Sequence, residues 1–187
     1  MRRQERIHDE FLAAAARAGD RRAFGELAAR WEKRLIRHAW RLSGDPEAAR
    51  DIAQSAWADI VRNIRRLDDT AAFPAFAFRI ATRRAADWTR RRKRARAGLA
   101  AFAAEPHPQS APGPESDAAA LVAAMARLPA EQRAAVALFY LEDLSVAEIA
   151  AALSVPAGTV KTRLKAARDR LREALGISLE KENEQAR

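Results

Sequence analysis

Basic side chains near the C-terminal end of the sequence stand at spacings that suit the binding of phosphates and bases. Lys161, Lys165, Arg168 and Arg172 follow one another at intervals of three or four residues, so a helix would place them along one side. Such a helix can offer its cationic side to a DNA major groove while an apolar side packs against the protein. The matching apolar stripe consists of Val160, Leu164, Ala167, Leu171 and Leu175.

A second cationic segment lies in the first half of the chain. It holds nine basic residues between Arg79 and Arg96 against a single acid, Asp87. Like charges four residues apart destabilise a helix, and neutralisation by phosphates would remove that cost. A basic terminus without a partner and a membrane-surface helix are the alternatives. The aromatic residues among these arginines favour nucleic acid, because rings and guanidinium groups stack on exposed bases.

The first basic stripe is positioned by a predicted helix-turn-helix. Ser145, with Glu148 three residues later, forms the pattern of a capping box at the start of a short helix. Residues 154–156 break that helix, since proline lacks the N–H group and clashes with the preceding turn. Pro156 suits the start of the next helix, which carries the basic stripe. A basic helix face is also common as plain solvated surface, so periodicity alone leaves DNA recognition and a solvated face open.

The rest of the sequence predicts an all-α fold, because glycine and strand-forming residues are few while alanine, leucine and arginine are abundant. A turn at 43–46, in which Asp45 caps and Pro46 begins the next helix, separates two of the helices. Residues 97–117 hold four of the eight prolines and predict a flexible linker between two small helical domains, 5–96 and 118–178. Fully extended, this linker would span on the order of 60 Å. The helices predicted before the helix-turn-helix cover residues 10–18, 22–42, 46–66, 73–94, 118–126 and 130–141.

Composition favours a polyanionic partner and excludes several chemistries. The 187 residues carry 34 basic and 25 acidic side chains, a formal charge of +9, and the excess lies in the first half. Without cysteine the chain has no disulfide, thiol nucleophile or cysteine-ligated zinc, and His8, His38 and His107 are too far apart in sequence to suggest a metal cluster. No pattern of a catalytic site or a phosphate-binding loop occurs, so we expect neither an enzyme nor a cofactor. The lack of a membrane-length apolar run and of a signal peptide predicts a cytoplasmic protein with no membrane insertion.

Both halves of the chain resemble the extracytoplasmic-function (ECF) sigma factors of bacterial RNA polymerase, which belong to the sigma-70 family. Residues 128–175 are similar to region 4 through LP-x3-R, S-x2-EIA and GTVK-x-RL. AFGELAARW near the start, DIAQSAW at 51–57 and F-x2-FAFRIA-x-R-x3-D at 73–87 are similar to region 2.

The resemblance implies a sigma factor that directs promoter recognition, melting of the −10 element and transcription initiation. Its partners would be core RNA polymerase and promoter DNA, as duplex at the −35 element and as single strand at −10, and the family also allows an anti-sigma factor. The alternative is a free-standing helix-turn-helix regulator. Such a regulator would need a dimer interface or a ligand or phosphoacceptor domain, which the first half does not offer.

The resemblance assigns three roles within the first domain. Contact with the polymerase clamp would fall to Asp51, Ile52, Gln54 and Trp57, although core packing is the favoured interpretation for Ile52 and Trp57. A base flipped from the melted strand would be captured by a loop, which must compensate the cost of unstacking. That loop consists of Leu67, Asp68, Asp69 and Thr70. The helix lining the −10 strand would supply Arg79, Arg83, Arg84 and Arg90.

In the second domain, the resemblance places the −35 duplex against the second helix of the helix-turn-helix. Base edges would be read by Lys161, Thr162 and Lys165, whereas Arg163 and Arg168 would hold phosphates. The full set of expected contacts is Thr159, Lys161, Thr162, Arg163, Lys165 and Arg168.

The chain departs from the usual family pattern at four positions. Arg50 and Ser55 stand where acidic residues are common, so the face expected to meet polymerase is less acidic than in the family. Arg83 replaces an asparagine of the strand-lining helix. Ala166 replaces an arginine of the recognition helix and can offer only a methyl group.

Overall fold

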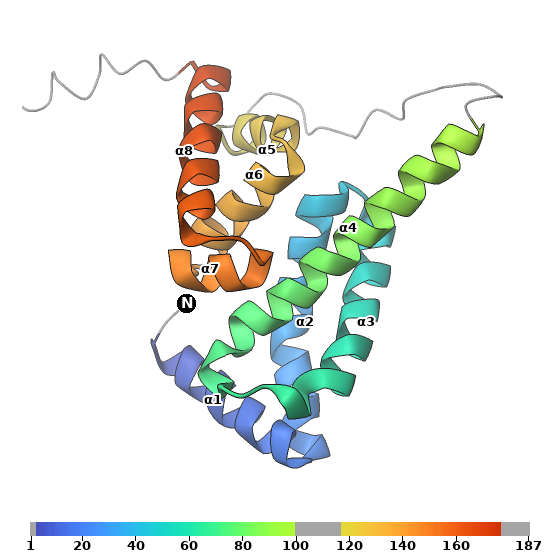
Figure 1. The fold of residues 1–187 in the computed structure, drawn as a ribbon, viewed down its shortest axis with the longest axis vertical. Helices are drawn as coiled ribbons and strands as arrows, with labels where there is room; N and C mark the ends of the chain where they lie inside the picture. The colour runs from blue at the N-terminus through green and yellow to red at the C-terminus, as the bar shows by residue number, and fades with distance from the viewer. Residues whose placement is uncertain (1–2, 100–116, 177–187) are drawn as a thin grey trace, which may run out of the picture.

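The computed structural model describes residues 3–99 and 117–176, and their regular secondary structure is helical (Figure 1). The predicted all-α fold is therefore confirmed. An N-terminal group contains α1 (Arg3–Ala18), α2 (Arg21–Ser43), α3 (Pro46–Asn63) and α4 (Phe73–Leu99). A C-terminal group contains α5 (Asp117–Arg127), α6 (Ala130–Val136), α7 (Val146–Leu153) and α8 (Ala157–Ala174).

Side-chain caps fix the helix starts that the sequence signalled. The Asp45 carboxylate accepts hydrogen bonds from the backbone N–H groups of Glu47 and Ala48, and Pro46 occupies the first turn of α3. Gly44 before it has a φ of 70°, a left-handed conformation that closes α2 and that glycine adopts without strain. The turn predicted at 43–46 is thus present.

Several helix boundaries differ from the prediction. α1 begins seven residues earlier than predicted, at Arg3, because the carboxylate of Asp9 is buried against α2 and holds this first part of the helix there. The third helix ends at Asn63 and continues as a 3-10 turn, Ile64–Arg66, while a second 3-10 turn covers Thr70–Ala72. The predicted helix over 130–141 changes after Val136 into a π-helical segment, Ala137–Leu141.

α4 runs on to Leu99, into the stretch predicted as linker. The rest of that predicted linker, 100–116, lies outside the described residues together with His107, as do residues 177–178 at the end of the second predicted domain.

Aromatic rings fill the centre of the N-terminal group. Trp31 of α2 packs edge-to-face on Phe73, with 5.1 Å between ring centroids, and at 5.5 Å from Phe78 of α4. All three side chains are almost fully buried. Leu27, Leu35 and Ala39 stand four or eight residues from Trp31, so they lie on the same face of α2, and all three are buried.

The helix-turn-helix forms as predicted. Ser145 and Glu148 make the reciprocal bonds of a capping box at the start of α7. Ser154 ends the helix in a left-handed conformation, and Pro156 precedes the first turn of α8. Ile149 of α7 is buried against the inner stripe of α8, namely Val160, Leu164 and Ala167.

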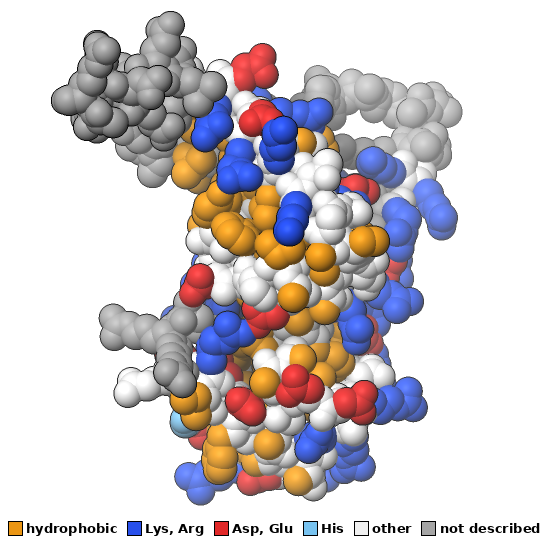
Figure 2. Space-filling model, turned by 60° about the vertical axis from the view of Figure 1, so that its left-hand side comes forward, with side chains coloured by type: hydrophobic (Ala, Val, Ile, Leu, Met, Phe, Trp, Pro, Cys, Tyr) orange, Lys and Arg blue, Asp and Glu red, His pale blue; other side chains and the backbone are white. Residues whose placement is uncertain are grey.

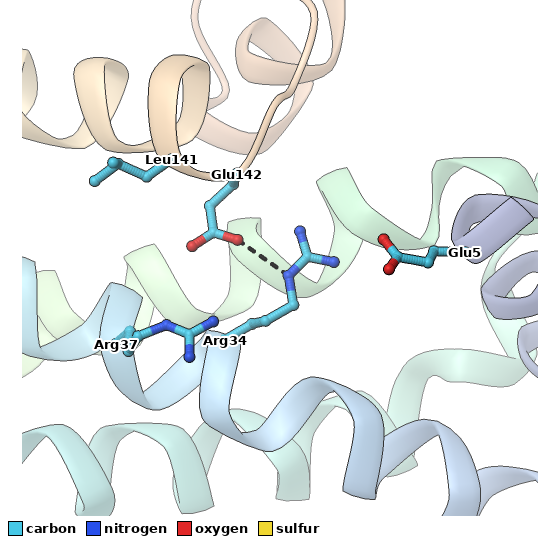
Figure 3. A pocket seen from close by; sticks show the side chains of 5 residues that line it. All are labelled: Glu5, Arg34, Arg37, Leu141 and Glu142. Carbon is cyan, nitrogen blue, oxygen red and sulfur yellow. Dashed lines mark hydrogen bonds and ion pairs between the residues drawn. The ribbon is translucent and has the colours of Figure 1, made fainter. Parts of the chain in front are cut away.

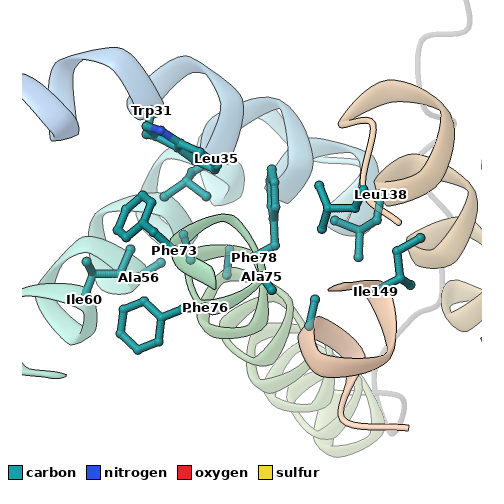
Figure 4. Packing of buried hydrophobic residues seen from close by; sticks show 14 of the residues in the cluster. Trp31, Leu35, Ala56, Ile60, Phe73, Ala75, Phe76, Phe78, Leu138 and Ile149 are labelled. Carbon is teal, nitrogen blue, oxygen red and sulfur yellow. The ribbon is translucent and has the colours of Figure 1, made fainter. Parts of the chain in front are cut away.

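The two groups pack against each other around one continuous core. α7 lies on α4, and α6 meets α2 (Figure 1). Phe78 projects from α4 between Trp31 on one side and Leu138 and Ile149 on the other (Figure 4). Apolar burial therefore holds the two groups together in this arrangement.

A buried carboxylate adds a polar contact to this interface. Glu142, 4% exposed, accepts hydrogen bonds from Arg34 Nε and from an Arg41 Nη nitrogen of α2, both at 3.0 Å. It lies beside a cavity of about 190 Å³ that Glu5, Arg37 and Leu141 also line (Figure 3). Arg133 of α6 donates a further bond to the carbonyl oxygen of Leu42 across the same interface. Within the described ranges, no helix is long and apolar enough to cross a membrane.

His38 is a fully buried ionisable group of the N-terminal core. Its Nε2 shares a hydrogen bond of 2.9 Å with Thr82 Oγ1, and its ring packs on Phe78. Burial, and secondarily the charge of Arg41, lowers the pKa of His38 from its ordinary value of 6.5 to about 3. The imidazole is therefore neutral in the folded protein at neutral and mildly acidic pH.

We expect stability to fall on acidification because of His38. Below pH 6.5 His38 is protonated in the unfolded chain but stays neutral in the folded protein. Its contribution to stability is therefore complete above that pH and is lost as the pH falls towards 3. Between about pH 7.5 and about pH 5.5 the loss should be about 1.4 kcal/mol. Urea unfolding of wild type and His38→Gln at both pH values measures it, and the variant should lose this dependence. An equal pH dependence in the two proteins would contradict the assignment to His38.

Candidate nucleic-acid interface

α8 separates an apolar side from a cationic side. Val160, Leu164 and Ala167 are buried, with Leu171 and Leu175 half-buried beyond them. The opposite stripe is exposed and basic, and blue Lys and Arg side chains gather in the upper part of the view in Figure 2. Its members are Lys161, Lys165, Arg168 and Arg172.

A groove of about 380 Å³ runs beside this stripe. Its apolar wall comes from the π-helical segment and α7, through Phe139, Tyr140 and Val146, and from Leu164 of α8. Lys161, Lys165 and Arg168 line its other side. Cations beside an apolar surface can meet phosphates or base acceptors together with a thymine methyl group.

Two of the residues expected to contact the −35 element form contacts within the protein instead. The Thr162 hydroxyl donates to the carbonyl oxygen of Gly158, at 3.0 Å, and Arg163 forms an ion pair with Glu131 of α6. The side chain of Arg163 is only 20% exposed, so it is directed at α6 rather than outward as a phosphate contact would require. Thr159 is half-buried in the first turn of α8. The outward cations that remain from the expected set are Lys161, Lys165 and Arg168.

α4 carries the second cationic surface, and acids of the protein partly neutralise it. Arg79 and Arg83 are exposed, whereas Arg84 pairs with Asp59 of α3 and Arg90 with Asp87 on its own helix. Partial burial raises the pKa of Asp59, but hydrogen bonds from Arg84 and Arg62 outweigh it and hold this pKa below its usual value. The charge repulsion expected along this helix is therefore reduced without a phosphate partner.

Arg92 extends the same surface and was not among the expected contacts. Its guanidinium lies 4.9 Å from the ring centroid of Trp88, and it also approaches Asp45 at 3.6 Å. An arginine stacked on an aromatic ring resembles the platforms that hold unstacked bases. The spacing of four residues between Trp88 and Arg92 was the available sequence signal.

The 67–70 loop turns one of its four expected side chains inward. Leu67 is 8% exposed because it joins the core beneath the 3-10 turn, so its side chain is not part of the loop surface. Asp68 and Asp69 are exposed and Thr70 is half-buried. The Asp69 carboxylate accepts a bond from the N–H of Ala71 at 2.9 Å, which fixes the end of the loop.

The residues expected to meet polymerase divide between surface and core. Asp51 and Gln54 are exposed on one side of α3, and Arg50 and Ser55 are exposed on the same helix. Ile52 is 3% exposed in the core. The half-buried Trp57 packs edge-to-face on Phe24 with 5.9 Å between ring centroids. Core packing, the favoured interpretation for Ile52 and Trp57, agrees with their positions.

Two further sets of contacts, both between distant parts of the sequence, were not predicted. Arg17 of α1 donates hydrogen bonds to the carbonyl oxygens of Leu67 and Asp68, and Glu142 binds Arg34 and Arg41 across the groups. Neither belongs to a motif, and the partners lie 50 to 108 residues apart in the chain. No local spacing could have identified them.

Comparison with known proteins finds family matches for the segments that carry both cationic surfaces. The family described as "Sigma-70 region 2" matches residues 27–95, and the family described as "Sigma-70, region 4" matches residues 118–171. The ECF RNA polymerase sigma factor SigM of Mycobacterium tuberculosis is 37% identical over 175 residues, covering 93% of this chain and 87% of SigM. SigE of Mycolicibacterium smegmatis is 35% identical over 159 residues, and the match covers 82% of this chain and 62% of SigE.

Solved structures share the arrangement of helices. CnrH, in a complex with the cytosolic domain of CnrY, is 26% identical with a TM-score of 0.68, covering 90% of this chain and 97% of CnrH. RpoE of Bartonella quintana, in a complex with the anti-sigma factor NepR, is 24% identical with a TM-score of 0.70, covering 83% of this chain and 98% of RpoE. The second likeness concerns the fold alone.

Proposed function

This chain belongs to the ECF sigma factors of the sigma-70 family, and we propose that it gives core RNA polymerase its specificity for a set of promoters. The single observation that carries the proposal is the pair of separate cationic surfaces, on α4 and α8, within the segments that match regions 2 and 4. A free-standing regulator would leave the region 2 half without a role. The chemistry of RNA synthesis belongs to the polymerase, with which the protein would work in the cytoplasm.

We assign the −35 duplex to α8. Its inner stripe fixes the helix on α7 and the rest of the C-terminal group, and Lys161, Lys165 and Arg168 face outward to a major groove. Arg163 supports the helix through Glu131 instead of binding a phosphate.

We assign the single-stranded −10 element to α4 and the 67–70 loop. Arg79 and Arg83 offer exposed cations, and Arg84 and Arg90 can exchange their internal acids for phosphates of the strand. Asp68, Asp69 and Thr70 supply the polar groups that would bind a flipped base. Asp51 and Gln54 on α3 remain the surface proposed for the polymerase clamp.

Engagement of both elements requires the two groups to separate. The −10 and −35 elements lie more than one helical turn of DNA apart, whereas α4 and α7 are in direct contact. The division into domains 5–96 and 118–178 with a connecting segment provides for that separation. An anti-sigma factor would act by covering one of the cationic surfaces.

The decisive test is transcription with purified core polymerase on a library of genomic fragments, with transcript starts mapped. We expect discrete starts that core polymerase alone does not produce, sharing two sequence elements upstream. A chain that binds these fragments without stimulating initiation would be a repressor or activator instead.

Lys165 provides a test of base reading at the −35 element. Lys165→Ala should weaken binding to a mapped −35 duplex by about 1–3 kcal/mol and change the preference at one or two base pairs. Arg170→Ala is the matched control, because this side chain lies on α8 against Gln132 of α6. An equal loss on all sequences, with only the salt dependence changed, would make Lys165 a phosphate contact.

A further inference from the structure

The 67–70 loop is held by a helix outside the segment that matches region 2. That match begins at residue 27, whereas α1 ends at Ala18. From the last turn of α1, one guanidinium nitrogen of Arg17 donates to the carbonyl oxygens of Leu67 and Asp68, at 2.9 Å each. Hydrogen bonds from a charged donor are stronger than neutral ones, so these two contacts restrain the loop backbone directly.

α1 is firmly packed on the N-terminal group, so the backbone that carries Arg17 is fixed in position. The Asp9 carboxylate, 3% exposed, accepts hydrogen bonds from Arg30 Nε at 2.8 Å and from Trp31 Nε1 at 2.9 Å. Leu12, Ala13 and Ala16 are buried in the core of the N-terminal group. A rotation of α1 would break these contacts, so the position of Arg17 is determined by the core and not by the loop.

The other contacts hold the two ends of the loop, so the backbone at Asp68 between them is the part that Arg17 restrains. The N–H of Leu67 bonds to Ile64 and its side chain is buried, which anchors the loop at its start. Asp69 caps the following 3-10 turn through Ala71, which anchors its end. Asp68 lies between these anchors with an exposed side chain, and the bond from Arg17 to its carbonyl oxygen sets its orientation.

We propose that Arg17 is a positioning residue for base capture, which holds the 67–70 loop in the conformation that receives a flipped base. The inference rests on the role proposed above for this loop. Unstacking a base costs a few kcal/mol, so a loop that is already ordered binds the base without an additional ordering cost. Arg17 thus makes α1 part of the −10 recognition module.

The test uses the full chain assembled with core polymerase and single-stranded DNA from a mapped −10 element. A matched set of strands carries an abasic site at one position at a time. The variant is Arg17→Met, which keeps a long side chain and the helix propensity but removes the donors. Arg21→Met, at an exposed arginine in the first turn of α2, is the control.

We expect Arg17→Met to weaken binding of the intact strand about tenfold, which is the effect expected from loss of the two hydrogen bonds that Arg17 donates to the loop. On the strand that is abasic at the captured position, Arg17→Met should bind as wild type does. Its salt dependence and its binding of the −35 duplex should be unchanged, and the duplex also reports that the variant is folded. Arg21→Met should behave as wild type on every strand.

Three results would overturn the inference. An equal loss on intact and abasic strands would make Arg17 a phosphate contact or a general structural residue. If Arg17→Met distinguished the intact strand from the abasic strand as well as wild type does, the loop would hold its conformation without the arginine. If wild type itself bound every abasic strand as tightly as the intact one, the role of the loop would fail, and this inference with it.

Discussion

Replacement of Phe78 by alanine is expected to lower the free energy of unfolding of the whole molecule by about 3–5 kcal/mol, as for other fully buried aromatic residues. The ring is fully buried. It packs at 5.5 Å from Trp31 and 5.0 Å from His38, between centroids, and faces Leu138 and Ile149 of the other group (Figure 4). The cavity would open at the point where the cores of both groups meet.

Urea unfolding followed by tryptophan fluorescence and by circular dichroism measures this effect. The four tryptophans all lie in the first half of the sequence, so fluorescence reports the N-terminal group while circular dichroism reports both groups. Phe11→Ala is the matched control, because Phe11 is 68% exposed. It should change stability by less than about 0.5 kcal/mol. A loss below about 1 kcal/mol for Phe78→Ala would show that the ring does not support the shared core.

Glu142→Lys is expected to separate the C-terminal group from the N-terminal group. While the two groups are packed together, the carboxylate is 4% exposed and accepts hydrogen bonds from Arg34 (Figure 3) and from Arg41. The substitution places a third cation against two arginines, and breaking a buried pair of this kind costs about 3–5 kcal/mol. Because the two arginine side chains are 16% and 20% exposed, solvent screening should reduce that figure to about 2–4 kcal/mol.

Small-angle X-ray scattering measures the separation as an increase in radius of gyration. Glu131→Lys is the control, since Glu131 is largely exposed and pairs with Arg163 inside the C-terminal group. It should leave the radius unchanged. Binding of Glu142→Lys to the −35 duplex should persist, because the outward face of α8 is not part of the interface. An unchanged radius in Glu142→Lys would show that apolar contacts alone keep the groups together.

The sequence by itself determined the features that depend on residues three or four positions apart. Val160, Leu164 and Ala167 are buried and Lys161 and Lys165 exposed, because helix geometry turns such spacings into faces. The capping box of Ser145 and Glu148 is equally local. The predicted all-α fold and the helix-turn-helix follow from interactions of this range, and the motifs of regions 2 and 4 identified the family.

Only the tertiary structure decided which of the expected side chains face outward. Arg163 looks in sequence like the cations beside it, yet Glu131 of another helix turns it inward. Leu67 stands in a polar stretch, yet the core beneath that stretch buries it. Arg17 reaches a loop 50 residues away, and Arg34 reaches Glu142 across 108 residues. Such partners meet only when packed helices bring them together, and helical periodicity carries no information on contacts at that separation.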